Sequence, residues 1–338
     1  MKNTELCIKQ YMEDGHLNNI AIRVGRKNEI LADVFMSDEK QISAQTVFDM
    51  ASITKIMVTT MLALIALDKN MICLEDTVNK FFETDSEKQA ITIKNLLTHT
   101  MGIGYKPLYN GACNYDNIAE YILKIPSDVA IGTETMYSCP GYILLGKILE
   151  KVMGEKLDKL FYKYISTPLG LKQSEFCPKG KYDFVNSNLL PEEIGMVNDY
   201  NCRFLGGICG NAGLFSCIDD ASIYAKMLLN YGNPLISEAT FKTAIKNYTE
   251  SMKSSRGLGF VYVDEKYTQT ANLFTNGSIG HCGHTGQSVF VDLNKDLYVI
   301  ILSDATNSVI KKYDKDKYDI VMKMRHDIHS AIKTDLSL

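Results

Sequence analysis

The chain has 338 residues, 46% hydrophobic and 22% charged, which is the composition of an ordinary globular protein with enough apolar side chains for a large core. Its formal net charge is −4 and it contains no long basic block, which argues against a nucleic-acid partner or an anionic membrane surface. The N-terminal residues include no apolar signal-peptide core, and the nine cysteines form no C-x-x-C pair, so we expect reduced thiols in a cytoplasmic protein.

Two β-prone runs, residues 19–24 and 30–36, open the chain and are separated by a predicted hairpin turn at residues 25–28. Residues 53–67 are then apolar almost all round and include no Pro or Gly, which predicts a buried helix. The longest apolar part of this run, residues 56–67, is too short to span a membrane, so we expect no membrane partner.

Ser52 and Lys55 stand at the start of this predicted helix. They are three residues apart, so a helix places them on one face. A lysine in a partly desolvated position has a lowered pKa, and its neutral amine can take the proton of a neighbouring serine hydroxyl. A helix-capping serine beside a snorkelling lysine produces the same pattern, so the S-x-x-K sequence alone leaves both interpretations open.

The middle of the chain predicts further helices. Residues 91–103 are expected to form a helix that ends at Gly102, and His99 is interpreted as a packed, hydrogen-bonded histidine rather than a metal ligand or a base. The proline that follows Cys139 disfavours the α region before it, so Tyr137 and Cys139 are expected on a non-helical loop that can present their side chains. Other helices are predicted at residues 118–125, 142–153, 157–165 and 219–229.

The glycine-rich residues 205–213 predict a tight backbone turn, because no G-K-[ST] follows that would favour a phosphate-binding loop. Three β-prone runs and a final helix follow at residues 257–264, 286–293, 296–303 and 313–332, with a hairpin turn at 294–295. Strands thus begin and end the chain. The predicted architecture is α+β, with one antiparallel sheet built from both termini and an inserted, mainly helical lobe.

Six stretches from about residue 20 to 304 carry a resemblance to a known family: residues 48–55, 96–103, 137–146, 168–171, 205–216 and 280–286. In this order they resemble the serine β-lactamase and penicillin-binding-protein superfamily, in particular its class C-like branch of β-lactamases, D-alanyl-D-alanine carboxypeptidases, D-aminopeptidases and esterases. The resemblance implies a β-lactamase/transpeptidase-like fold in a single catalytic domain, residues 1–338. Its α/β lobe would comprise about 1–50 and 255–338, its helical lobe about 51–254, with the cleft between them.

The resemblance also implies roles for individual residues. Ser52 would be the nucleophile and Lys55 its first partner, and Tyr137 matches the tyrosine of the family's Y-x-N motif. A phenol whose pKa is lowered by a neighbouring ammonium could act as base for Ser52 and later as acid for the leaving group. How Lys55 and Tyr137 divide this work stays open.

The third motif of the family, H-x-G, has two overlapping matches. The family continues H-T-G-x-x-G-x-S, and the later glycine and serine fit this frame only if His281 opens it, so we assign the motif to His281, Cys282 and Gly283. The oxyanion hole would then consist of the backbone N–H groups of Ser52 and His284. A metal site at this His-Cys-Gly-His run is disfavoured, because alternate residues of a strand face opposite ways, and we expect no metal or cofactor.

Two departures from the family pattern bear on the substrate. Cys139 stands where many members have an Asn that binds the acyl amide, and His281 stands where β-lactamases have a Lys that attracts a carboxylate. We therefore expect a serine hydrolase that forms an acyl-enzyme on a small ester, amide or short peptide, with weak or no β-lactamase activity. The rival hypothesis is a non-catalytic relative that keeps the fold for binding or assembly.

Overall fold

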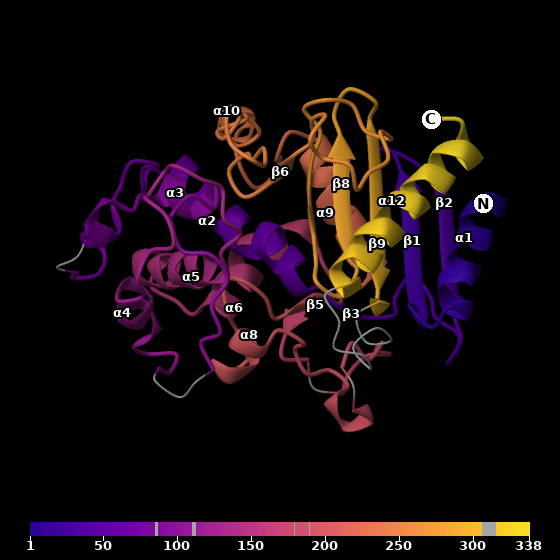
Figure 1. The fold of residues 1–338 in the computed structure, drawn as a ribbon, viewed down its shortest axis with the longest axis horizontal. Coiled ribbons are helices and arrows are strands. Elements are labelled where there is room, and N and C mark those ends of the chain that lie inside the picture. The colour runs from indigo at the N-terminus through magenta and orange to yellow at the C-terminus, as the bar shows by residue number, and fades with distance from the viewer. Residues whose placement is uncertain (85–86, 110–112, 179, 189, 306–315) are drawn as a thin grey trace.

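The computed structural model describes residues 1–338 apart from 85–86, 110–112, 179, 189 and 306–315. It shows an antiparallel sheet with helices on both faces beside a mainly helical part (Figure 1). This arrangement confirms the predicted fold class.

The large sheet has six antiparallel strands in the order β2 (Ile30–Ser37), β1 (Asn19–Gly25), β9 (Leu297–Ser303), β8 (Ser288–Asp292), β7 (Ile279–Cys282) and β6 (Val261–Tyr262). In the register, Ile22 of β1 pairs with Val34 on one side and with Ile301 on the other. The two ends of the chain therefore share one sheet, as the sequence predicted. β7 was not among the predicted strands, because its four residues include Gly280 and have no apolar alternation.

Each face of the sheet is covered by helices, because alternate side chains of a strand point to opposite sides. Ile20, Ile22 and Val24 pack with apolar residues of α1 (Lys2–Glu13) and α12 (Asp316–Leu336), while Ala21 joins the core that extends into the helical part. The Tyr11 hydroxyl donates to Asp327 at 2.8 Å and joins α1 to α12. Both termini thus lie over the same face (Figure 1).

Three sequence-based expectations about this part need correction. The chain begins with a helix, α1, rather than with a strand. Helix α9 (Ile218–Leu229) packs on β1, β8 and β9, although the sequence placed it in a helical lobe of residues 51–254. Its burial against the sheet could not be read from its own pattern. The expected start of the last helix, residue 313, lies outside the described residues, and the helix extends to Leu336.

The helical part is built around one buried segment, Ala51–Asp68. It starts as a 3₁₀ turn (Ala51–Ile53), continues as a π-helix (Lys55–Thr60) and ends as α2 (Met61–Asp68). The helical part also contains α3 (Ile93–Leu97), α4 (Ile118–Leu123), α5 (Cys139–Met153), α6 (Leu157–Phe161), a π-helical stretch (Tyr162–Ser166), α7 (Thr167–Leu169), α8 (Tyr200–Phe204) and α10 (Glu238–Ala244), of which α5, Tyr162–Ser166 and α10 pack on the segment.

A second, three-stranded sheet of order β3-β5-β4 joins the two parts, with β3 (Phe48–Asp49), β5 (Leu214–Ser216) and β4 (Glu175–Phe176). The sequence had predicted a single sheet, since strands of two or three residues give no periodic signal. The glycine-rich loop before β5 forms the predicted tight turn, with positive φ at Gly206, Gly207 and Gly213.

Among the described residues, the segment Ala51–Asp68 is long and apolar enough by length and composition to cross a membrane. However, 89% of it is buried inside the protein, and the core helix of a folded protein passes the same test. The segment is thus explained by the core it forms.

Candidate active site

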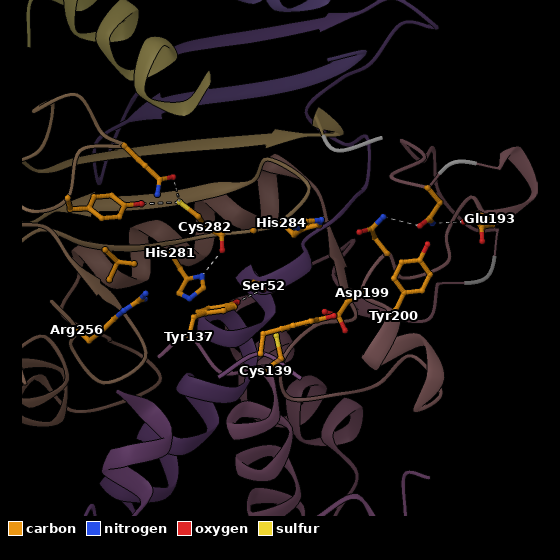
Figure 2. A pocket seen from close by; sticks show the side chains of 17 residues that line it. Ser52, Tyr137, Cys139, Glu193, Asp199, Tyr200, Arg256, His281, Cys282 and His284 are labelled. Atoms are coloured by element: carbon orange, nitrogen blue, oxygen red, sulfur yellow. Dashed lines mark hydrogen bonds between the residues drawn. The ribbon is translucent and has the colours of Figure 1, made fainter. Parts of the chain in front are cut away.

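Ser52 lies in the 3₁₀ turn Ala51–Ile53, at the start of the buried helical segment. Ala51, directly before it, has a φ of +45°, a left-handed conformation that costs a residue with a Cβ about 1–2 kcal/mol. The buried carboxylate of Asp49 accepts the N–H of Ala51 at 2.7 Å and that of Asn198 at 2.7 Å, and so stabilises this turn. Burial raises the pKa of Asp49 to about 6. The turn presents the Ser52 side chain to a cavity (Figure 2).

Two side chains converge on the Ser52 hydroxyl. Tyr137, on the predicted non-helical loop, donates its O–H to Ser52 Oγ at 2.6 Å, and Lys55 Nζ donates to the same oxygen at 3.0 Å. Lys55 is fully buried; it also donates to the backbone carbonyl of Asn211 at 2.8 Å, and its Nζ lies 4.8 Å from the centre of the Tyr137 ring. The arrangement places two groups with proton-transfer chemistry within hydrogen-bond distance of one hydroxyl.

Cys139 does not lie on the loop. It is the first residue of helix α5, whose N-cap Ser138 accepts the N–H of Gly141 at 3.0 Å. Pro140 is compatible with the first turn because its missing N–H has no intrahelical partner there. The Cys139 thiol lies 3.8 Å from Lys55 Nζ, and burial raises its pKa, so a neutral thiol occupies this wall of the site.

His281 is buried beside Tyr137, with ring centres 6.1 Å apart. Its Nδ1 lies 2.7 Å from the Cys282 carbonyl, and in the described part of the chain its Nε2 has no hydrogen-bond partner. Desolvation, assisted by the nearby cations Arg256 and Lys55, holds the pKa of His281 well below its usual value. At neutral pH this side chain therefore carries no charge into the cavity.

Gly283 brings the end of β7 against the turn that carries Ser52. A Cβ on Gly283 would lie 3.0 Å from the Met50 carbonyl oxygen and 3.3 Å from the Ala51 Cβ, so the close approach depends on glycine. His284 follows and is exposed, with its side chain on the cavity wall (Figure 2). Of the two histidines, His281, which was predicted to line the cleft, is thus buried, and His284 is exposed.

His99 is a packed, hydrogen-bonded histidine, as the sequence predicted. Its Nδ1 accepts the Ser138 N–H at 3.0 Å, and its ring lies 4.8 Å from that of Tyr137 and 5.0 Å from that of Tyr142. Burial holds its pKa well below the usual value. The prediction that this helix extends to Gly102 is wrong, because α3 ends at residue 97 and His99 has a φ of +58°.

A model of the β-lactamase family matches residues 5–321. The chain belongs to the β-lactamase family. Two relatives in this family, from Escherichia coli O157:H7 and Escherichia coli strain K12, bear names that place them among the D-alanyl-D-alanine carboxypeptidases. Each is 25% identical to this chain, over 324 and 327 residues, and each alignment covers 84% of this chain and 74% of the relative.

Several solved structures share the fold. EstCE1, described as a hydrolase with promiscuous acyltransferase activity, superposes with a TM-score of 0.79 at 18% identity and covers 98% of this chain and 97% of its own. A β-lactamase/D-alanine carboxypeptidase from Pseudomonas syringae gives 0.76 at 16% identity, with 97% and 98% covered. An octameric penicillin-binding-protein homologue from Pyrococcus abyssi gives 0.76 at 20% identity, with 99% and 77% covered. The predicted class, a serine hydrolase of the β-lactamase-related family, agrees with these findings.

The cavity beside Ser52 has a volume of about 520 Å³ and includes charged residues that the family motifs do not contain. Arg256 and Asp199 line it on opposite sides of Ser52 and Tyr137 (Figure 2). Asp199 accepts the side-chain amide of Asn211 at 3.1 Å. Neither residue could be predicted from the sequence, because isolated charges in irregular segments give no local signal.

Like Nε2 of His281, the Nε and Nη1 atoms of Arg256 are buried and have no hydrogen-bond partner in the described part of the chain. A buried guanidinium normally donates to carbonyl or carboxylate oxygens. Arg256 therefore places in the cavity wall a positive charge with two donors that no described residue uses.

In the part of the chain that the structure describes, no group of three or more His, Cys, Asp or Glu side chains is arranged to hold a metal ion. The Cys282 thiol instead lies 3.1 Å from the Tyr267 hydroxyl.

Proposed function

We propose that this chain is a serine hydrolase that cleaves an ester or amide through an acyl-enzyme on Ser52. The observation that carries the proposal is the Ser52 hydroxyl, held at 2.6 Å from the Tyr137 oxygen and 3.0 Å from the Lys55 nitrogen in the wall of a cavity. An ordinary capping serine would instead bond to backbone N–H groups of its own helix. The family match and the neighbouring hydrolases support the same reaction class.

In the proposed reaction the Ser52 oxygen attacks the substrate carbonyl carbon while its proton passes to the Tyr137–Lys55 pair. The oxyanion that forms accepts hydrogen bonds from the backbone N–H groups of Ser52 and His284. The leaving group then departs with a proton from Tyr137, and water attacks the acyl-enzyme by the same route in reverse. The close approach of Gly283 to the Ser52 turn supports this role for the His284 backbone.

For the substrate class we propose a short peptide or depsipeptide that carries a carboxylate. The support is Arg256, whose buried Nε and Nη1 have no partner among the described residues and whose guanidinium points toward His281 and Tyr137 (Figure 2). Charge-assisted pairing of a guanidinium with a carboxylate satisfies such nitrogens. The names of the Escherichia coli relatives fit a substrate with a C-terminal carboxylate. In this proposal Arg256 supplies the positive charge that the motif lysine supplies in β-lactamases, and His281 contributes an uncharged side chain to the cavity wall.

Intact-mass measurement after exposure to a fluorophosphonate tests the reaction class. The wild type should gain one adduct, on the peptide that contains Ser52, and Ser52→Ala should gain none and lose several orders of magnitude in ester turnover. Asp327→Asn, on the opposite face of the sheet, serves as the control and should label like the wild type. An unlabelled wild type would favour the rival hypothesis, a non-catalytic relative that binds rather than hydrolyses.

A further inference from the structure

Arg325 is a second buried arginine near the site, and it comes from the C-terminal helix α12. Its side chain is 2% exposed, and in the described part of the chain it makes no ion pair with a carboxylate. A buried ion pair or cation seldom adds to stability, since an apolar residue of similar volume is often as good or better. The acceptors that Arg325 binds therefore bear on what it does in the fold.

The guanidinium of Arg325 donates to backbone carbonyls at both ends of one turn. Nη2 donates to the Gly283 carbonyl and Nε to the Gly286 carbonyl at 3.3 Å. Nη1 donates to the Gln269 side chain at 3.1 Å, and Gln269 lines the cavity. Three separate acceptors thus fix the side chain, and through it the turn is attached to α12.

This turn, residues 283–286, carries the His284 backbone N–H. On its other side Gly283 lies against the Met50 carbonyl, directly before the Ser52 turn. The turn closes on itself through the Gly286 N–H, which donates to the Gly283 carbonyl at 3.2 Å. The segment therefore lies between the nucleophile on one side and the Arg325 guanidinium on the other.

We infer that Arg325 is a positioning residue that sets the distance between the His284 N–H and the Ser52 N–H. The inference rests on the proposed function, because it assigns those two N–H groups to the oxyanion. Arg325 does not touch the substrate; it acts by holding the carbonyls of Gly283 and Gly286, which fixes the direction of the peptide units between them. A guanidinium suits this task because its donors form a rigid planar fork.

The test compares Arg325→Met, Arg325→Lys and the control Met324→Ala. Met324 is buried on the same helix and belongs to the apolar core that α12 shares with the sheet, so its truncation should destabilise α12 while it leaves the hydrogen bonds of Arg325 to the turn in place. A misplaced oxyanion donor should lower kcat of Arg325→Met on p-nitrophenyl butyrate about 10- to 100-fold with little change in KM. Arg325→Lys, which can reach one carbonyl, should retain more activity. Met324→Ala should have a lower Tm and a nearly unchanged kcat.

Hydrogen exchange followed by mass spectrometry provides a measurement that does not depend on turnover. Amides of residues 283–287 should exchange faster in Arg325→Met than in the wild type and in Met324→Ala. Equal kcat losses in Arg325→Met and Met324→Ala, or unchanged exchange of this segment, would overturn the inference. If Arg325→Met does not fold, Arg325→Lys is judged by the same two criteria. A wild type that neither turns over nor labels refutes the proposed function alone, and the exchange comparison still decides whether Arg325 holds the turn.

Discussion

Replacing Arg256 by Met removes a guanidinium and keeps an unbranched side chain, and the structure predicts opposite effects on binding and on stability. A hydrogen bond between charged groups contributes about 1.5–3 kcal/mol, so kcat/KM for a substrate with a carboxylate should fall about 10- to 150-fold. In the free protein, Nε and Nη1 are buried and have no partner among the residues that the structure describes, which costs about 1–3 kcal/mol. Arg256→Met should therefore be more stable to heat than the wild type.

The assay uses one D-depsipeptide ester in two forms, with a free C-terminal carboxylate and with a C-terminal amide. The wild type should prefer the carboxylate form, and Arg256→Met should lose this preference while it hydrolyses the amide form as before. Arg26→Met is the matched control, because Arg26 is 46% exposed and pairs only with the exposed Glu29 in the described structure. A lower Tm together with equal losses on both substrates would show that Arg256 is a structural residue, and the proposed substrate class would then be wrong.

Three further predictions concern the other residues of the site. If Tyr137 and Lys55 act as one proton-transfer unit, Tyr137→Phe and Lys55→Ala should each be nearly inactive in ester hydrolysis, and the double variant should be little worse than either. A double variant whose loss of activity equals the product of the two single losses would contradict this. His281→Ala should lower kcat/KM more than His284→Ala, because His284 contributes its backbone; the reverse ranking would refute the assigned H-x-G frame. Nitrocefin should be hydrolysed slowly relative to p-nitrophenyl acetate. Cys139→Asn should raise the nitrocefin rate, because the neutral Cys139 thiol is a weak hydrogen-bond donor and a poor acceptor. An unchanged rate would show that Cys139 does not determine substrate specificity.

Several features could be predicted from the sequence because they depend on residues close together in the chain. The apolar run after Ser52 predicted a buried helix, and the three-residue spacing placed Lys55 beside Ser52 whatever the exact helix type. The β-prone runs at both ends of the chain predicted the shared sheet. Tyr137 contacts Ser52 across 85 residues, and its place in the site was predicted through the family resemblance rather than through any local pattern.

Other features depend on which groups meet in the folded chain. Arg256 and Arg325 have the same chemistry as residues, but in the described structure Nε and Nη1 of Arg256 lack partners, whereas Arg325 binds two backbone carbonyls and a side-chain amide. Likewise the pKa of His281 is lowered by burial and by cations distant in sequence. Local spacing therefore determined that Lys55 lies beside Ser52, while desolvation and long-range hydrogen bonding, which exist only once the chain is packed, decided which charges line the cavity.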